Sequence, residues 1–325
     1  MRTRRWALGV AALLLAACRR PDPVETAMGE IRAEAIEAHL RFLASDLTEG
    51  RAPGTRGIEV AAEYVAAQFR RAGLAPAVGD TSYFQRVPFV GMTPDPQLAF
   101  VAGGRRFPLR YRDEFVAWSG EQVPEVAAEG EVVFVGYGTY APEFDWNDYK
   151  DVDVTGKVLL MLVNDPGKTE PGRFRGDTLT YYGRWTYKFE EAARRGATGA
   201  VLVHTTELAG YPWSVVRASW GGEQFELPQR AGEPRVPVKG WIPWEVAARV
   251  LAAAGQDLDA LYAAAQRPDF RPVETGVRMA ARVRTRLRRI ESSNVAGLLR
   301  GRARPDEVVV YTSHYDHLGI GTPVN

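Results

Sequence analysis

The spacing of apolar residues divides the chain into helical and extended segments. Apolar residues recur every three or four positions from about Glu30, and again over 58–71, which predicts two amphipathic helices. Short continuous apolar runs instead predict buried strands; they lie at 132–135, 158–163, 200–204 and 308–312. Between and after the middle runs, helical periodicity returns near 187–195, 244–254 and 258–265. Residues 81–118 are punctuated by Pro and Gly and predict several short strands.

A period of two is clearest from Val277 to Arg288. Apolar side chains alternate there with arginines, which predicts a half-buried strand with one basic face; the arginines are Arg278, Arg282, Arg284, Arg286 and Arg288. Such a row can bind an anionic surface. More often it is solvated or pairs with acids on a neighbouring strand, and we favour this second interpretation.

The apolar run at 308–312 leads into a dense polar cluster, His314-Tyr315-Asp316-His317. Neutral imidazole is a good zinc ligand, and ligands collect beyond the carboxyl ends of strands in open α/β sheets. A carboxylate two residues along an extended segment points to the same side as the histidine and can accept its other ring N–H. On chemistry alone, a surface turn that contains histidines explains the pattern equally well. After His317 the sequence has no further Asp, Glu, His or Cys.

Composition narrows the class of protein. The 325 residues are 46% hydrophobic and 25% charged, which is typical of globular proteins and argues against disorder. The length indicates two domains, or one domain with a large insertion. Lys and Arg number 41 against 40 Asp and Glu, so no global charge favours nucleic acid as a partner.

The N-terminus predicts an export signal. Arginines at positions 2, 4 and 5 precede an apolar stretch that is too short to span a bilayer as a mature helix. The stretch ends in Leu15-Ala16-Ala17-Cys18, which resembles a bacterial lipobox, and Cys18 is the one cysteine in the sequence. We therefore expect residues 1–18 to be a lipoprotein signal peptide with Cys18 as the lipidation site; an ordinary cleaved signal with an incidental cysteine is the alternative. Arg19 after Cys18 favours the outer membrane, facing the periplasm, and 19–29 is predicted to be a tether.

Other motifs do not support a nucleotide site. Residues 165–169 end like a phosphate-binding loop, but Leu162 stands where the pattern needs glycine. Residues 136–141 match a relaxed dinucleotide fingerprint, yet the sequence that follows does not predict the required helix. His39 and His204 stand alone, without other ligand-type residues in a metal-binding spacing, and are interpreted as structural.

Two segments around the His314 cluster carry a family resemblance. Residues 294–301 and 308–319 resemble the start of the catalytic domain of the M28 family of zinc peptidases. The Gly-rich stretch 50–55, with the helix after it, also resembles members of this family. The middle, residues 115–266, resembles the protease-associated (PA) domain that is often inserted there. Together these likenesses cover nearly the whole mature chain.

The resemblance implies a fold class and a domain order. The class is α/β: an incomplete zinc-exopeptidase-type α/β/α sheet domain with an inserted β-rich α+β PA domain. Residues 30–114 would form the N-terminal part of the peptidase domain, 115–266 the PA-like insertion and 267–325 the start of the catalytic core.

The resemblance also implies roles for two residues. His314 matches the family's first zinc ligand, and Asp316 matches the carboxylate that orients it. The family uses two zinc ions, whose other ligands and general base lie downstream of this motif and have no counterpart in the 325 residues. One histidine with an orienting aspartate does not fill a catalytic zinc site, so the chain alone is expected to be inactive.

Three functional hypotheses follow. The first is the N-terminal portion of a secreted, lipid-anchored, zinc-dependent exopeptidase of aminopeptidase type, with a peptide or protein substrate. The second is a non-catalytic, lipid-anchored binding protein built on the PA-like domain. The third is a related enzyme of the same fold that cyclises its substrate or removes other groups. The sequence identifies no substrate-binding residues and no oligomeric state.

Overall fold

Two compact units make up the protein. The computed structural model describes residues 22–150, 152–168, 172 and 174–321. One unit contains the residues up to Arg86 and those from Glu291 onward, and the other contains Val87–Ile290. The units divide between residues 86 and 87 and between residues 290 and 291, outside the predicted insertion at 115–266. At both points the chain passes from one unit to the other within a long strand rather than in a loop.

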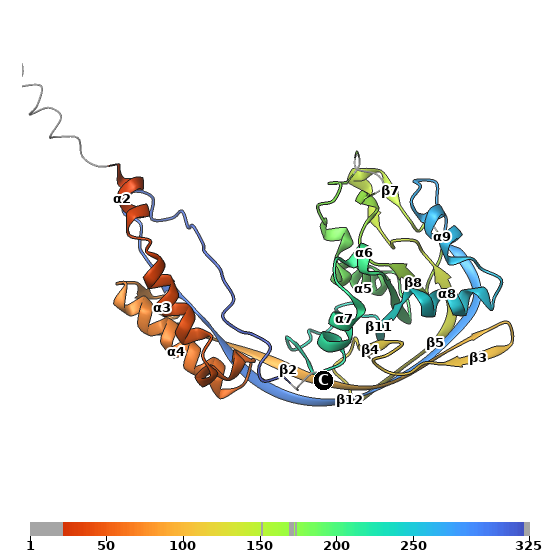
Figure 1. The fold of residues 1–325 in the computed structure, drawn as a ribbon, viewed down its shortest axis with the longest axis horizontal. Helices are drawn as coiled ribbons and strands as arrows, with labels where there is room; N and C mark the ends of the chain where they lie inside the picture. The colour runs from red at the N-terminus through yellow and green to blue at the C-terminus, as the bar shows by residue number, and fades with distance from the viewer. Residues whose placement is uncertain (1–21, 151, 169–171, 173, 322–325) are drawn as a thin grey trace, which may run out of the picture. The chain divides into compact units, whose positions relative to one another are not determined.

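The first unit, up to Arg86 and from Glu291, is helical in its N-terminal half. Its elements are α2 (Pro23–Gly29), α3 (Ala33–Leu43), the 3-10 helix η1 (Asp46–Arg51), α4 (Arg56–Arg71), β1 (Ala75–Pro76) and β13 (Gly297–Leu298). Figure 1 draws the helices in red and orange. Part of the predicted tether is thus helical: Asp22 accepts a hydrogen bond from the Val24 N–H at 2.8 Å and caps α2, with Pro23 in its first turn.

The predicted strand at 308–312 is wrong. This segment has no regular structure, and no described strand pairs with it. Val308, Val309, Val310 and Tyr311 are 72–95% exposed. A β-strand is stabilised by hydrogen bonds to a neighbouring strand, and the apolar run alone does not supply that neighbour.

The second unit, Val87–Ile290, is built on a mixed sheet of nine strands. The strands are β2 (Phe84–Ala102), β3 (Arg105–Pro108), β4 (Val116–Ser119), β5 (Glu125–Phe134), β8 (Val158–Leu162), β9 (Gly199–His204), β10 (Gln224–Glu226), β11 (Val238–Pro243) and β12 (Val273–Val295). Their order is β10-β2-β12-β5-β8-β9-β11-β4, with β3 beside β2. Strands β5, β8, β9 and β11 are parallel, whereas β12 and β4 pair antiparallel to β5 and β11. The prediction of only short strands before residue 118 is wrong for β2, which has 19 residues.

Helices cover both faces of this sheet (Figure 1). Helices α8 (Trp244–Ala252) and α9 (Leu258–Ala265) pack on one face through residues such as Val250 and Leu261. Helices α5 (Trp185–Arg194), α6 (Thr206–Ala209) and α7 (Trp213–Trp220) pack on the other. The remaining short elements are β6 (Tyr140–Ala141), η2 (Pro142–Phe144), β7 (Trp146–Asn147), η3 (Pro166–Lys168) and η4 (Tyr181–Gly183). The fold is therefore mixed α/β, as predicted.

The basic face of β12 pairs with acids, as we favoured from the sequence. Arg282 and Arg284 both reach Glu125 on β5, at 3.1 and 3.2 Å, and Arg278 lies 3.5 Å from Glu129. Arg288 forms two hydrogen bonds with Glu223, of 2.6 and 2.8 Å. These pairs satisfy most of the row without an anionic ligand.

Candidate functional site

The backbone of the first unit makes a left-handed turn at residues 49–51. Glu49, Gly50 and Arg51 have φ values of 49°, 64° and 52°. Such values suit glycine but are unfavourable for Glu and Arg, so the surrounding contacts must hold them. A Cβ on Gly50 would lie 2.4 Å from the Gly319 carbonyl oxygen, so only glycine fits this close approach.

The turn binds the segment that follows His314. Arg51 Nε donates to the Tyr315 carbonyl oxygen at 2.7 Å, and the Arg51 carbonyl oxygen accepts from the His317 N–H at 2.9 Å. The Gly319 N–H donates to the Gly50 carbonyl oxygen, also at 2.9 Å. The two segments that carry the sequence resemblance, 50–55 and 308–319, are therefore in direct contact.

His314 and Asp316 lie on the exposed side of this segment, with side chains 79% and 53% exposed. His314 Nδ1 is 2.9 Å from the Asp316 backbone carbonyl oxygen and 3.5 Å from its carboxylate Oδ1. Because a carbonyl oxygen only accepts, Nδ1 carries the proton in this contact, and Nε2 is the nitrogen with a lone pair for a metal. The backbone carbonyl of Asp316 is thus the nearer orienting group, and the role of its carboxylate stays a prediction.

The side chains of His314 and Asp316 are too few to form a complete zinc site. His314 offers one nitrogen and Asp316 one carboxylate, whereas a catalytic zinc normally has three protein ligands. The structure groups no three His, Cys, Asp or Glu side chains in a metal-binding arrangement within the described ranges. These residues alone therefore do not support a catalytic step through zinc.

The other histidines make ordinary hydrogen bonds. His39 Nδ1 lies 2.9 Å from the Tyr64 hydroxyl, between α3 and α4. His204 Nε2 donates to the Tyr211 carbonyl oxygen at 3.0 Å, and burial lowers the pKa of His204 below its usual value. Both contacts agree with the structural interpretation.

The predicted lipidation site, Cys18, lies outside the described residues, as does the whole predicted signal peptide. Within the part of the chain that the structure describes, no helix is both long enough and apolar enough to cross a membrane.

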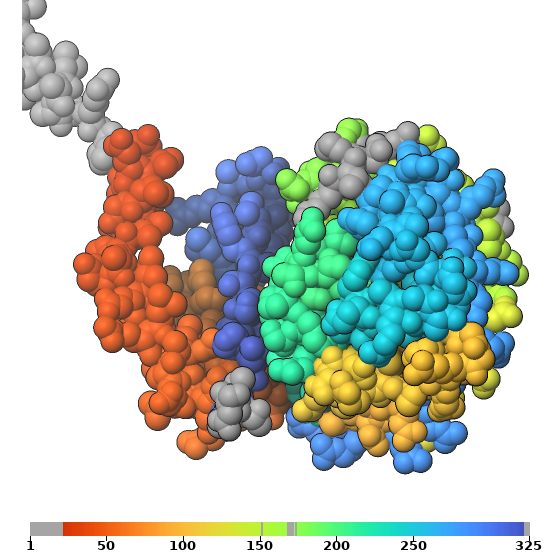
Figure 2. Space-filling view, turned by 45° about the vertical axis from the view of Figure 1, so that its right-hand side comes forward, coloured from red at the N-terminus to blue at the C-terminus, as the bar shows by residue number. Residues whose placement is uncertain are grey.

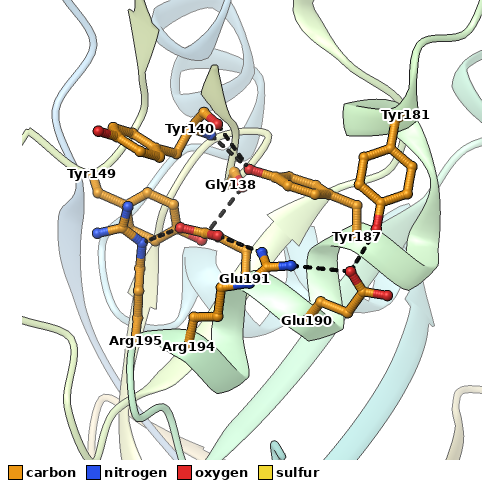
Figure 3. Close-up of polar contacts among 9 residues, drawn as sticks. All are labelled: Gly138, Tyr140, Tyr149, Tyr181, Tyr187, Glu190, Glu191, Arg194 and Arg195. Carbon is orange, nitrogen blue, oxygen red and sulfur yellow. Dashed lines mark hydrogen bonds and ion pairs between the residues drawn. The ribbon is translucent and has the colours of Figure 1, made fainter. Parts of the chain in front are cut away.

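A polar cluster on α5, which the sequence did not predict, holds the 138–149 loop (Figure 3). The Tyr187 hydroxyl accepts from the Tyr140 N–H at 2.9 Å and donates to the Tyr140 carbonyl oxygen at 3.2 Å. Arg195 Nε donates to Glu191 at 2.7 Å, while its guanidinium lies 3.7 Å from the centre of the Tyr149 ring. These contacts are satisfied within the cluster, which indicates a structural role.

Beside this cluster, Lys188 is fully buried in α5. Its Nζ donates to the Tyr137 carbonyl oxygen, and the carboxylates of Asp148 and Asp165 act on it electrostatically. Burial lowers the pKa of Lys188 to about 7 and raises the pKa of Asp148 to about 6. A buried lysine of this kind has no signature in the sequence beyond its place in an amphipathic helix.

Comparison with known proteins gives distant structural similarities. No protein-family model matches the chain, and no match is found among curated proteins. Solved structures that match include an aminopeptidase from Aneurinibacillus sp. strain AM-1, at 18% identity and a TM-score of 0.39, over 84% of this chain and 49% of that chain. A peptidase M28 precursor from Shewanella amazonensis SB2B matches at 14% identity and a TM-score of 0.34, over 87% of this chain and 57% of that one. A zinc aminopeptidase from Bacillus subtilis matches at 14% identity and a TM-score of 0.32, over 84% and 48%.

The chain spans about half the length of these structures. The identities and TM-scores are too low to transfer functional residues or an activity from these structures to this chain.

Proposed function

We propose that these 325 residues are the N-terminal portion of a zinc-dependent exopeptidase of aminopeptidase type. The observation that carries the proposal is the contact between the 49–51 turn and residues 315–319. This contact fixes the backbone on both sides of Asp316 and leaves the His314 ring exposed. In the complete protein, His314 would be one ligand of a two-zinc centre, Asp316 would be its orienting partner, and the substrate would be a peptide.

Further zinc ligands would come from residues that follow position 325 in the complete protein. A catalytic zinc needs more protein donors than His314 and Asp316 provide. The 325 residues alone are accordingly expected to bind zinc weakly and to leave peptides intact.

Activity and zinc content test this proposal together. Hydrolysis of an aminoacyl nitroanilide and zinc stoichiometry would be measured for the 325-residue chain and for the protein expressed from its complete coding sequence. The proposal expects zinc-dependent turnover in the complete protein alone. Turnover by the 325-residue chain would contradict the claim that its zinc site is incomplete. A stable complete protein that neither binds zinc nor hydrolyses peptides would instead favour the non-catalytic, PA-domain binding protein.

The proposal includes export and lipid anchoring at Cys18, with the protein facing the periplasm from the outer membrane. The support is the Leu-Ala-Ala-Cys sequence at 15–18 and the single cysteine. Metabolic labelling with a radioactive fatty acid tests it: label should enter the wild type and not Cys18→Ser. Label in both proteins, or in neither, would refute the anchor.

A further inference from the structure

A cleft opens in the second unit at the carboxyl ends of β9 and β11. Its volume is about 520 Å³, and its lining includes His204 and Pro243, the last residues of the two strands. The strands are parallel neighbours, but the helices that follow them pack on opposite faces of the sheet. When the helices that follow two neighbouring strands lie on opposite faces of the sheet, a crevice forms at the ends of those strands. Open α/β sheets bind ligands in such crevices. In Figure 2 the green surface that contains α6 and α7 lies beside the cyan surface that contains α8.

The lining of the cleft is aromatic and acidic. Trp213, Trp244 and Tyr262 supply aromatic rings, and the Trp244 and Tyr262 rings meet edge to face with centres 5.7 Å apart. Three carboxylates line the same space, from Glu207, Glu245 and Asp259, and none of the described lysines or arginines does. Glu245 and Asp259 form no ion pair with any described residue. Aromatic faces and carboxylates both attract organic cations.

His204 adds a hydrogen-bond acceptor to this lining. The residue is only 3% exposed, and its Nε2–H donates to the Tyr211 carbonyl oxygen. Its Nδ1 has no hydrogen-bond partner among the described residues. Burial lowers the pKa of His204 and so favours the neutral ring, in which Nδ1 carries a lone pair. A ligand that donates N–H groups would satisfy it.

The carboxylates of Glu245 and Asp259 also have a structural explanation. The experiment must distinguish that explanation from ligand binding. Glu245 and Asp259 stand in the first turns of α8 and α9, where the helix dipole favours an acid. The dipole does not explain why both acids border the same aromatic cleft, nor the unpartnered nitrogen of His204. We propose that this cleft binds an organic cation, a guanidinium or alkylammonium group on an aliphatic stem, whose stem contacts the aromatic rings and whose N–H groups meet the acceptors.

Calorimetric titration of the 325-residue protein tests the site without zinc and without activity. The probes are acetyl-arginine amide, its neutral analogue acetyl-citrulline amide, and a blocked pentapeptide with a central arginine. The cation should bind at least about tenfold tighter than citrulline, because cation–π contacts and ion pairs are both lost in the neutral probe. Tighter binding of the pentapeptide than of the small amide would identify a peptide side chain as the source of the cation. Equal binding of the two would identify a free small cation.

Paired variants locate the binding. Glu245→Gln with Asp259→Asn should weaken the arginine probe about tenfold, since each exposed ion pair contributes up to about 1 kcal/mol. Glu59→Gln is the matched control, because Glu59 is also an exposed first-turn acid but does not line the cleft. Absence of binding at millimolar probe, equal binding of citrulline, or unchanged affinity of the double variant would each overturn the proposal. The result is independent of the proposed peptidase, whose failure would show in zinc and turnover instead.

Discussion

Arg51 and Tyr315 are 264 positions apart in sequence and are joined by a hydrogen bond of 2.7 Å from Arg51 Nε to the Tyr315 carbonyl oxygen. The same guanidinium also donates to the Leu43 carbonyl oxygen at the end of α3. Arg51 thus links three segments of the first unit, and its own φ of 52° shows that the backbone is strained to do so.

Arg51→Ala should loosen the segment that carries His314. Hydrogen bonds from a charged donor contribute about 1.5–3 kcal/mol each, so the free energy of local opening at 315–319 should fall by about that amount. Hydrogen exchange of the His317 and Gly319 amides measures it directly. Arg56→Ala is the control, because Arg56 is exposed and its side chain forms no hydrogen bond or ion pair with a described residue. Unchanged protection in the Arg51 variant would mean that this side chain does not hold the segment.

A pair of glycine substitutions separates backbone strain from close contact. Gly50 and Gly73 both have positive φ, of 64° and 76°, so alanine costs about 1 kcal/mol at either position. Only at Gly50 would the new Cβ meet an atom, the Gly319 carbonyl oxygen at 2.4 Å, whereas Gly73 has nothing within 4 Å. Gly50→Ala should therefore lower the unfolding free energy by about 1–3 kcal/mol more than Gly73→Ala in urea unfolding. Equal losses would show that the approach of Gly50 to Gly319 is not maintained in solution.

Tyr187→Phe should destabilise the second unit because it removes both hydrogen bonds to Tyr140 (Figure 3). An unsatisfied backbone group costs about 1–3 kcal/mol when it is buried, and somewhat less here because Tyr140 is 44% exposed. Tyr181→Phe is the matched control: its hydroxyl binds the exposed Glu190, so the loss should stay below about 1 kcal/mol. Thermal unfolding of the two variants compares them, and a larger loss in the control would contradict this ranking.

Lys188 should make stability rise with pH above neutrality. Its pKa is about 7 in the folded protein and near the usual lysine value of 10.5 when the chain is unfolded, so between these values the unfolded state binds more protons. The free energy of unfolding then increases with pH, by up to about 1.4 kcal/mol per pH unit. Lys188→Met should lack this slope from about pH 7 to 10, although it also loses the bond to the Tyr137 carbonyl. Urea unfolding at each pH measures the difference, and parallel curves would show that Lys188 is charged in the folded state.

Local sequence patterns correctly predicted helices, whose hydrogen bonds are local, and strands in which the alternation of apolar and polar residues is long. Helix α9 occupies the predicted residues 258–265, and the alternating arginines of β12 mark a strand whose basic face meets Glu125 and Glu129. The strand at 308–312 failed because an apolar run does not reveal whether a neighbouring strand is available. Of the candidate site, the sequence proposed roles for His314 and Asp316, which stay predictions, and assigned no role to Arg51. Nothing local to residues 49–51 indicates left-handed backbone at Glu49 and Arg51, or a bond 264 positions away.

The proposed function requires that the Arg51 turn present His314 as a zinc ligand. The most direct measurement is the zinc content and peptidase activity of His314→Ala and His317→Ala, each in the protein expressed from its complete coding sequence. His317 is the matched control, since it is an exposed histidine in the same segment and only its backbone N–H is used, by Arg51. The prediction is that His314→Ala loses bound zinc and nearly all activity, whereas His317→Ala keeps both. Full zinc content and full activity in His314→Ala would contradict it.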